Sequence, residues 1–366
     1  MGQMVEILSQ GRPISRIYMA QDIDGIEECL EGYGHIYAVM DNSVALHCPA
    51  ALHLAGILNR MSVPGLLVNA AEETKNMESV MGICGWLLEQ GADRDALVLA
   101  VGGGITSDMV GFAASIYKRG VRFAYVPTTL LSQVDAAIGG KTGVNFRKYK
   151  NMLGVIRQPE FTWVCPQMLE GLSRRDFLSG AAEMLKTFII EDGGNYGKAV
   201  GLLSRISEAD EDRWEDTLKQ HREELLGLTA AAVRVKAGVV SRDQYEADER
   251  RKLNLGHTFA HAVETLAGKN DMDISHGEAV AMGILLAARL SDRLRKDDRD
   301  LYGTLRDDFL RCGLPVESPF PPVRMTEIMR KDKKAEDGIV HFVIPYAVGD
   351  VRMEDLDVEE VAALLA

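Results

Sequence analysis

The stretch ALVLAVGGGITSDMVGF, residues 96–112, decides the fold of this chain. It begins with the continuous apolar run of a buried strand, turns through three glycines and continues with helical spacing of apolar residues. Glycines permit a tight turn, and the helix that follows presents free N–H groups and a positive dipole end to a pyrophosphate. Such a turn is also common as a simple strand-to-helix connection, and this one lacks the GxGxxG spacing of an ordinary Rossmann site.

The neighbouring segments repeat the alternation of strand and helix. Apolar runs predict strands at residues 35–41, 65–69, 96–101 and 123–127. Helical spacing predicts helices over residues 43–60, 73–90 and 105–117. Strands that alternate with helices indicate a parallel sheet covered by helices.

Beyond about residue 170 the pattern becomes mainly helical. Helices are predicted over residues 173–191, 212–240, 244–267 and 275–295, with one clear strand at 341–345. We therefore predict an α/β N-terminal Rossmann-like domain with a parallel sheet, residues 1–165. A mainly α-helical C-terminal domain, residues 166–366, would follow it.

Composition narrows the class of protein. The 366 residues carry a formal net charge of −13, which argues against a general nucleic-acid or anionic-membrane surface. The five cysteines share no CxxC spacing, which favours reduced thiols over a disulfide framework or a thiolate metal site. With no signal-peptide pattern and no apolar run of about 18 residues, we expect a cytoplasmic protein without a membrane partner.

A histidine-rich constellation lies in the helical half. LNLGHTFAHAVE places His257 and His261 on one face of a helix, and ISHGEAV places His276 at the start of another. Upstream, SGAAEMLK puts Glu183 and Lys186 on one helical face. Two imidazoles and a carboxylate make a catalytic type of zinc site. Histidines at this spacing are also common as ordinary polar residues, and the absence of HExxH argues against a zincin-type protease.

Two further stretches carry groups suited to a phosphorylated, hydroxylated substrate. PTTLLSQVDAAIGGKTGVN, residues 127–145, sets Asp135 and Lys141 in apolar, glycine-rich surroundings that resemble a pocket. VKAGVVSRDQYEADERRKLN, residues 235–254, is rich in charge and also fits a solvated helix face. Lysine and arginine would neutralise phosphate and carboxylate, and asparagine would bond hydroxyl groups.

These stretches, in this order, closely resemble the 3-dehydroquinate synthase family. The resemblance runs from about residue 70 to residue 345 and includes KNMLG, SHGEAVAMG and RKDKK. It implies zinc, or cobalt in its place, held by Glu183, His257 and His276. It implies that the domain of residues 1–165 binds NAD and that the domain of residues 166–366 binds metal and substrate. The implied NAD contacts come from Asp41, Glu72, Lys75, Gly103, Gly104, Ile105, Asp108, Thr128, Thr129 and Lys150.

The resemblance also implies a catalytic and substrate-binding set. Glu246 and His261 match proton-transfer positions, and Lys186 and Asp135 match further catalytic positions. Substrate contacts would come from Arg119, Lys141, Asn151, Lys236, Arg250 and Asn254, with Lys333 or Lys334 completing the pocket. Because Arg119 matches an arginine that reaches the neighbouring subunit's substrate, a homodimer is implied.

The chain departs from the family pattern at three places. Asp41-Asn42-Ser43 stands where Asp-x-Asn is usual, Ala260 replaces a common glycine, and Ser179 stands where asparagine is also common. None of these removes a predicted metal ligand. The expected reaction converts 3-deoxy-D-arabino-heptulosonate 7-phosphate, a phosphorylated sugar acid, into 3-dehydroquinate and phosphate with NAD regenerated in each cycle. Valiolone-type or deoxy-inosose-type cyclases, a metal-dependent polyol dehydrogenase and an inactive binding module are the alternatives.

Overall fold

The computed structural model describes residues 3–147, 149–295, 298–331 and 339–365. The chain divides into two compact units, Met1–Phe177 with Asp212–Tyr245, and Leu178–Glu211 with Glu246–Ala366. The sequence analysis placed one boundary at residue 165, whereas each unit is built from two segments. The functional assignment of the two domains stays a prediction.

A seven-stranded sheet forms the centre of the first unit, in the order β1-β2-β9-β6-β5-β3-β4. The strands are β1 (Gln3–Ser9), β2 (Arg12–Met19), β3 (Ile36–Asp41), β4 (Gly65–Val68), β5 (Leu97–Gly102), β6 (Arg122–Pro127) and β9 (Phe161–Val164). All neighbours pair in parallel except β1 and β2. The predicted parallel sheet is confirmed, and β1, β2 and β9 are strands that the sequence analysis missed.

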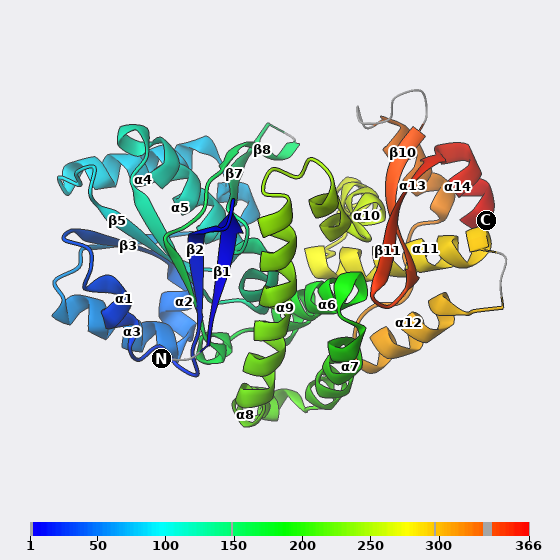
Figure 1. Ribbon diagram of the computed structural model, residues 1–366, viewed down its shortest axis with the longest axis horizontal. Coiled ribbons are helices and arrows are strands. Elements are labelled where there is room, and N and C mark those ends of the chain that lie inside the picture. The colour runs from blue at the N-terminus through cyan, green and yellow to red at the C-terminus, as the bar shows by residue number, and fades with distance from the viewer. Residues whose placement is uncertain (1–2, 148, 296–297, 332–338, 366) are drawn as a thin grey trace. The chain divides into compact units, whose positions relative to one another are not determined.

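Helices cover both faces of this sheet (Figure 1). Residues of α1 (Ile26–Leu30) and α3 (Pro49–Arg60) pack on one face, and residues of α4 (Met77–Glu89) and α5 (Gly104–Ile116) on the other. Strand β5 shows the alternation that this requires, since Leu97 and Leu99 enter one core and Val98 and Ala100 the other. Both faces of the strand are therefore buried, as its unbroken apolar run predicts.

The segment Asp212–Tyr245 belongs to the first unit because α9 (Arg222–Arg242) packs against β1. Val233 and Ala237 of the helix join Ile7 and Ile17 in one buried cluster. The shorter helix α8 (Trp214–Gln220) precedes it. This packing joins the edge of the sheet to a segment more than two hundred residues away in sequence.

A separate antiparallel hairpin also belongs to the first unit. It pairs β7 (Lys141–Phe146) with β8 (Tyr149–Ile156). The two strands cross closely at a pair of glycines, because a β-carbon on Gly143 would lie 2.6 Å from the carbonyl oxygen of Leu153. The hairpin therefore depends on glycine at this crossing.

The second unit is mainly helical, with one hairpin of β10 (Ile339–Ala347) and β11 (Asp350–Asp357). Helix α6 (Arg174–Glu191) begins in the first unit and continues into the second. The other helices are α7 (Gly193–Ser207), α10 (His257–Lys269), α11 (His276–Arg295), α12 (Leu301–Arg311), α13 (Pro322–Lys331) and α14 (Val358–Leu365). Helices α10 and α11 pack against each other.

The predicted single helix over residues 244–267 is wrong in its first half. A short 3-10 helix at Glu249–Asn254 precedes α10, and Gly256 adopts a left-handed φ of 78° just before His257. A β-carbon on Gly256 would lie 2.8 Å from the backbone nitrogen of Ile284, so glycine is required there for two reasons. The start of α10 is consequently fixed at His257.

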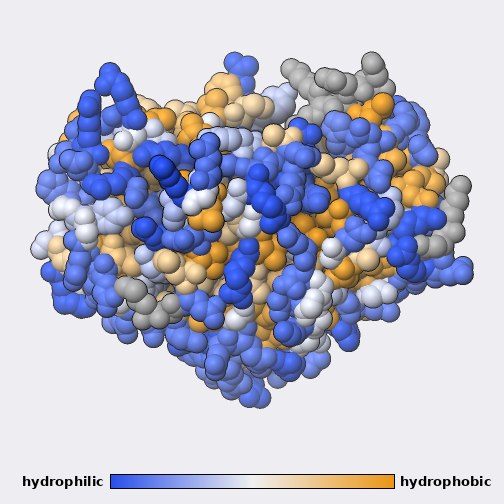
Figure 2. All heavy atoms as spheres, in the orientation of Figure 1, coloured by the Kyte–Doolittle hydropathy of each residue, from blue (hydrophilic) through white to orange (hydrophobic). Residues whose placement is uncertain are grey.

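Within the described residues, none of the helices has the length and apolar character needed to cross a membrane. Hydrophilic residues cover most of the face shown in Figure 2, with apolar residues distributed among them. This agrees with the acidic composition of the chain.

Candidate active site

The three predicted metal ligands converge in the second unit. One ligand atom from each of Glu183, His257 and His276 lies within 4.8 Å of the other two. Oε1 of Glu183 is 3.8 Å from Nε2 of His257 and 3.4 Å from Nε2 of His276. Tetrahedral zinc with bonds of about 2.0–2.1 Å separates its ligand atoms by about 3.3 Å, so this spacing fits one ion.

Both imidazoles are oriented through their other ring nitrogen. Nδ1 of His257 lies 3.1 Å from the carbonyl oxygen of Leu255, and Nδ1 of His276 lies 3.4 Å from Oε1 of Glu264. A hydrogen bond donated by Nδ1 leaves the lone pair on Nε2, which is the tautomer that a metal ligand needs. Each histidine ligand therefore has its own orienting hydrogen-bond partner behind it, an arrangement typical of metal sites.

Lys186 forms an ion pair with the second carboxylate oxygen of Glu183. Its Nζ lies 2.5 Å from Oε2 of Glu183, and both side chains are almost completely buried. The ion pair directs Oε1 toward the two imidazoles. Removing either partner alone would leave an unpaired buried charge, at a cost of about 3–5 kcal/mol, so Glu183 and Lys186 depend on each other.

Helix α6 carries a second attachment one turn before Glu183. Oγ of Ser179 accepts a hydrogen bond of 3.0 Å from the backbone N–H of Gly277, in the first turn of α11. A β-carbon on Gly277 would collide with the backbone of Ser179. The backbones of α6 and α11 are therefore in direct contact at Ser179 and Gly277, and this contact fixes the position of His276 at the start of α11.

Burial and charge shift the pKa values of the two imidazoles in opposite directions. Burial, followed by the charge of Lys186, lowers the pKa of His257 to about 3. Burial also acts to lower the pKa of His276, but hydrogen bonds and charge from Glu183 and Glu264 raise it to about 10. A metal ion would therefore meet a neutral His257 and would displace a proton from His276.

The remaining predicted residues of this unit lie just before and within α10. Nδ2 of Asn254 donates a hydrogen bond of 2.8 Å to Oε1 of Glu246, which has a left-handed φ of 61°. Arg250 is buried, and His261 is exposed with its ring centroid 5.8 Å from that of His257. The predicted ligand set excludes His261, and the cluster of convergent ligand atoms excludes it too.

The glycine turn connects β5 to α5 in the first unit. Among the described residues no side chain caps α5, so the N–H groups of its first turn remain available to an anion. A β-carbon on Gly103 would lie 3.1 Å from Cγ2 of Thr129, and one on Gly104 would lie 3.0 Å from Cβ of Ala136. The turn therefore has room for backbone only, as a close approach to pyrophosphate requires.

Other predicted nucleotide residues follow the carboxyl ends of neighbouring parallel strands. The chain runs outward from β3 to β4 and then returns to β5 on the other side of β3, which creates a topological switch point. Asp41 ends β3, where its carboxylate accepts a hydrogen bond of 3.0 Å from the N–H of Ser43. Thr128 follows β6, and its buried Oγ1 has no hydrogen-bond partner within the described part of the chain.

A buried lysine joins two predicted ligand groups in the same unit. Nζ of Lys75 lies 2.6 Å from Oδ2 of Asp108 and 2.5 Å from Oδ1 of Asn151. Burial raises the pKa of Asp108 to about 6, although Lys75 opposes that shift. Asn145, which the sequence analysis did not single out, accepts from the backbone N–H of Asn151 and donates to Glu72 at 2.8 Å.

Asp135 and Lys236 form a second charged pair in this unit. Nζ of Lys236 lies 2.6 Å from Oδ1 of Asp135 and 2.7 Å from its carbonyl oxygen. Asp135 belongs to a single π-helical turn, Ser132–Ala136, a form common at functional sites.

The predicted site residues of the first unit that are exposed are Glu72, Arg119, Lys141, Lys150 and Asn151. Ile105 lies in the first turn of α5. Lys333 and Lys334 lie outside the described residues.

Sequence reasoning missed Glu264 as well as Asn145. Glu264 lies seven residues after His257 on α10, a spacing that places both on one helical face. This spacing could have identified Glu264 as a neighbour of the histidine ligands.

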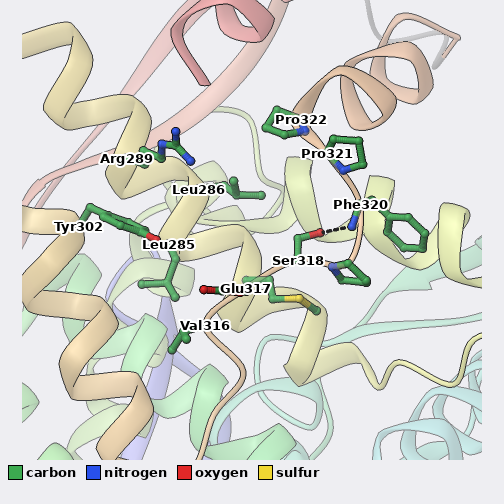
Figure 3. A pocket seen from close by; sticks show the side chains of 12 residues that line it. Leu285, Leu286, Arg289, Tyr302, Val316, Glu317, Ser318, Phe320, Pro321 and Pro322 are labelled. Atoms are coloured by element: carbon green, nitrogen blue, oxygen red, sulfur yellow. Dashed lines mark hydrogen bonds between the residues drawn. The ribbon is translucent and has the colours of Figure 1, made fainter. Parts of the chain in front are cut away.

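Figure 3 shows a cavity elsewhere in the second unit, with a volume of about 430 Å³. Apolar residues, several of them prolines, form most of its lining, and the charged residues among them are Arg289 and Glu317. None of the predicted site residues lines it. Its chemistry gives no reason to prefer it to the ligand cluster as the active site.

The fold, the ligand cluster and the glycine turn place this chain in the structural class of the sugar-phosphate cyclases. The 2-epi-5-epi-valiolone synthase of Streptomyces hygroscopicus, solved with NAD+ and Zn2+ bound, superposes with a TM-score of 0.81 at 29% identity, covering 99% of this chain and 98% of that one. A 2-deoxy-scyllo-inosose synthase, solved with carbaglucose-6-phosphate, NAD+ and Co2+, shares the fold with a TM-score of 0.80 at 21% identity, covering 99% of both chains.

The chain belongs to the 3-dehydroquinate synthase family. The family described as 3-dehydroquinate synthase N-terminal matches residues 65–179, and that described as 3-dehydroquinate synthase C-terminal matches residues 180–335. A 3-dehydroquinate synthase of Rhodopirellula baltica is 38% identical over 334 residues, covering 90% of this chain and 84% of the relative. The resemblance inferred from the sequence is confirmed.

Proposed function

We propose that this chain converts 3-deoxy-D-arabino-heptulosonate 7-phosphate into 3-dehydroquinate and phosphate, with one zinc ion and one NAD. The observation that carries the proposal is the convergence of Glu183, His257 and His276 in a member of this family. Two imidazoles and one carboxylate leave ligand positions open for a substrate oxygen. Cobalt, which accepts the same donor set, could replace zinc.

The two cofactors supply complementary chemistry when they are bound: NAD is a temporary hydride acceptor, and zinc is a Lewis acid for the alcohol oxygen. The uncapped first turn of α5 and the glycine turn would receive the pyrophosphate. Lys75 and Asp108, already in contact, would define the adjacent wall of the nucleotide site. Glu183, with its oxygen Oε2 bound by Lys186, would present a fixed oxygen to the metal.

Fixed cations would bind the two anionic ends of the substrate. We assign this role to Lys141, Lys236 and Arg250, with Asn151 and Asn254 bonding hydroxyl groups. Positioned charges stabilise a leaving phosphate without any reorganisation at the moment of reaction. Because the departing phosphate can itself accept the neighbouring carbon-bound proton, Glu246 and His261 need only move protons between oxygen atoms.

The direct test measures inorganic phosphate released from the heptulosonate by purified protein. We expect release with zinc and catalytic amounts of NAD, and loss of release after chelation that added zinc restores. The absence of phosphate release with zinc and NAD present would reject the proposal. A steady rise in absorbance near 340 nm with a simple polyol would instead identify a polyol dehydrogenase.

A valiolone-type cyclase is the second candidate, because a structure of such an enzyme is 29% identical with a TM-score of 0.81. Its substrate would carry no carboxylate, so fewer cations would be needed in the pocket. Parallel assays with the heptulosonate and with a sugar phosphate that lacks the carboxylate discriminate between the two. Turnover of the carboxylate-free sugar alone would favour the second candidate.

We also propose a cytoplasmic homodimer in which Arg119 acts in the partner's site. Arg119 is exposed in the 3-10 turn Tyr117–Arg119 that follows α5, with a left-handed φ of 69°. Mixing Arg119→Ala with His257→Ala chains should restore activity, because a mixed dimer contains one site with both groups intact. Analytical ultracentrifugation that shows only monomers, or mixing that restores nothing, would contradict this arrangement.

A further inference from the structure

We infer that Glu264 is the positioning residue that fixes the orientation and tautomer of His276, and that it thereby sets the metal affinity of the cluster. The inference rests on the proposed metal site and deepens it. Glu264 does not face the other two ligands as a fourth member of the cluster. It acts through the ring nitrogen of His276 that points away from Glu183.

The first line of evidence is the geometry of the imidazole of His276. Its Nε2 lies 3.4 Å from Glu183, and its Nδ1 lies 3.4 Å from Glu264. The two carboxylates therefore occupy opposite sides of one ring. Because only one ring nitrogen carries hydrogen in neutral imidazole, a proton directed to Glu264 leaves Nε2 as the metal-facing lone pair.

The second line of evidence is where Glu264 comes from. It lies on α10, the helix that begins with the ligand His257, and it reaches across to the first residue of α11. Helices α10 and α11 pack against each other, and the Glu264 side chain is only 12% exposed. A mostly buried carboxylate requires a donor, and His276 supplies one.

The third line of evidence is the contrast between the two histidine ligands. His257 is oriented by the carbonyl oxygen of Leu255, which no substitution of a side chain can remove. His276 is oriented by a side chain, so this ligand depends on residue identity at position 264. Second-layer partners of this type change metal affinity by about 10–100-fold.

The test titrates metal-free protein with Co2+ against a chromophoric chelator, without NAD or substrate, so that failure of the proposed reaction cannot affect the result. We expect Glu264→Ala to weaken Co2+ binding about 10–100-fold and to alter the visible Co2+ absorption spectrum. Glu264→Gln should recover most of the affinity, because its amide oxygen still accepts from Nδ1.

A double-mutant cycle separates positioning from general destabilisation. In a His276→Ala background, Glu264→Ala should weaken the remaining affinity by less than about twofold, since its target is gone. The matched control is Glu224→Ala, which removes the carboxylate 3.0 Å from Nδ1 of His221 in an exposed pair and should leave Co2+ binding unchanged. Unchanged affinity in Glu264→Ala, or an equal loss with and without His276, would overturn the inference.

Discussion

The ligand cluster of the second unit and the glycine turn of the first would hold their proposed ligands by different means. The cluster consists of side chains from α6, α10 and α11, each directed by a further contact. The turn consists of backbone, and its essential property is the absence of side chains at Gly103 and Gly104. The first site is therefore sensitive to the removal of atoms, and the second to their addition.

The comparison is tested most strongly by removing a metal ligand. His257→Ala should weaken Zn2+ or Co2+ binding by more than about 100-fold, which exceeds the loss caused by second-layer changes. Phosphate release should fall to background, whereas NAD binding in the other unit should persist. Metal analysis and NAD titration of the same preparation check this. Retention of stoichiometric metal would show that the cluster is not the metal site.

Removing His261 should separate catalysis from metal binding. His261→Ala should retain metal, because its ring lies outside the convergent ligand set. Turnover should slow by about 100-fold or more, which is the usual effect of losing a proton-transfer group. Metal content and the rate of phosphate release are the two measurements. Metal loss equal to that of His257→Ala would reassign His261 as a ligand.

Adding a β-carbon to the glycine turn tests whether that turn needs to be free of side chains. Gly104→Ala places a β-carbon 3.0 Å from that of Ala136, so Ala136 or the start of α5 must give by a few tenths of an ångström. We expect NAD affinity to fall at least about tenfold with metal affinity unchanged, since one lost pyrophosphate contact is worth about 1.4 kcal/mol.

Gly82→Ala is the matched control for this substitution. It lies on α4 of the same unit, and its β-carbon would meet no atom within 4 Å. NAD affinity should not change. Equal losses in both variants, measured by fluorescence titration with NADH, would mean that the turn has no special role.

The smallest expected effect concerns the buried pair of Lys75 and Asp108. Burial raises the pKa of Asp108 from 3.8 to about 6, so the folded chain holds this proton more tightly than the unfolded chain. Its contribution to stability is therefore complete at low pH and is lost as pH rises from about 4 to 6.

We expect the unfolding free energy of the natural chain, relative to Asp108→Asn, to fall by on the order of 1 kcal/mol across this window. Urea unfolding at pH 4.5, 5.5 and 7.5 measures the difference. A difference that does not vary with pH would contradict the assigned shift.

Most of the fold could be predicted because its signals are local. The apolar run before Gly102 defines β5. The start of α10 was missed, because the left-handed φ of Gly256 and its close approach to Ile284 depend on tertiary packing. The hairpin of β7 and β8 was missed because KTGVNF and YKNMLGVI contain central glycines and show no clean alternation. Strand β1 depends on α9, which no local pattern reveals.

The ligand cluster was predicted from residue types and from a family resemblance, and its three members do converge. The orienting contacts could not be predicted in the same way. Glu264 meets His276 only because α10 and α11 pack with a particular crossing and register. Ser179 meets Gly277 for the same reason between α6 and α11. Such contacts depend on tertiary geometry that sequence spacing does not encode.

The pairing of Glu183 with Lys186 has a further consequence for the electrostatics of the cluster. The acid contributes −1, the lysine +1, two neutral imidazoles nothing and Glu264 beside His276 a further −1, so the group sums to −1. Because Lys186 offsets Glu183, a divalent ion bound there would keep a net positive charge to act on the substrate. An overall acidic protein can thus present a net positive point to an anionic substrate.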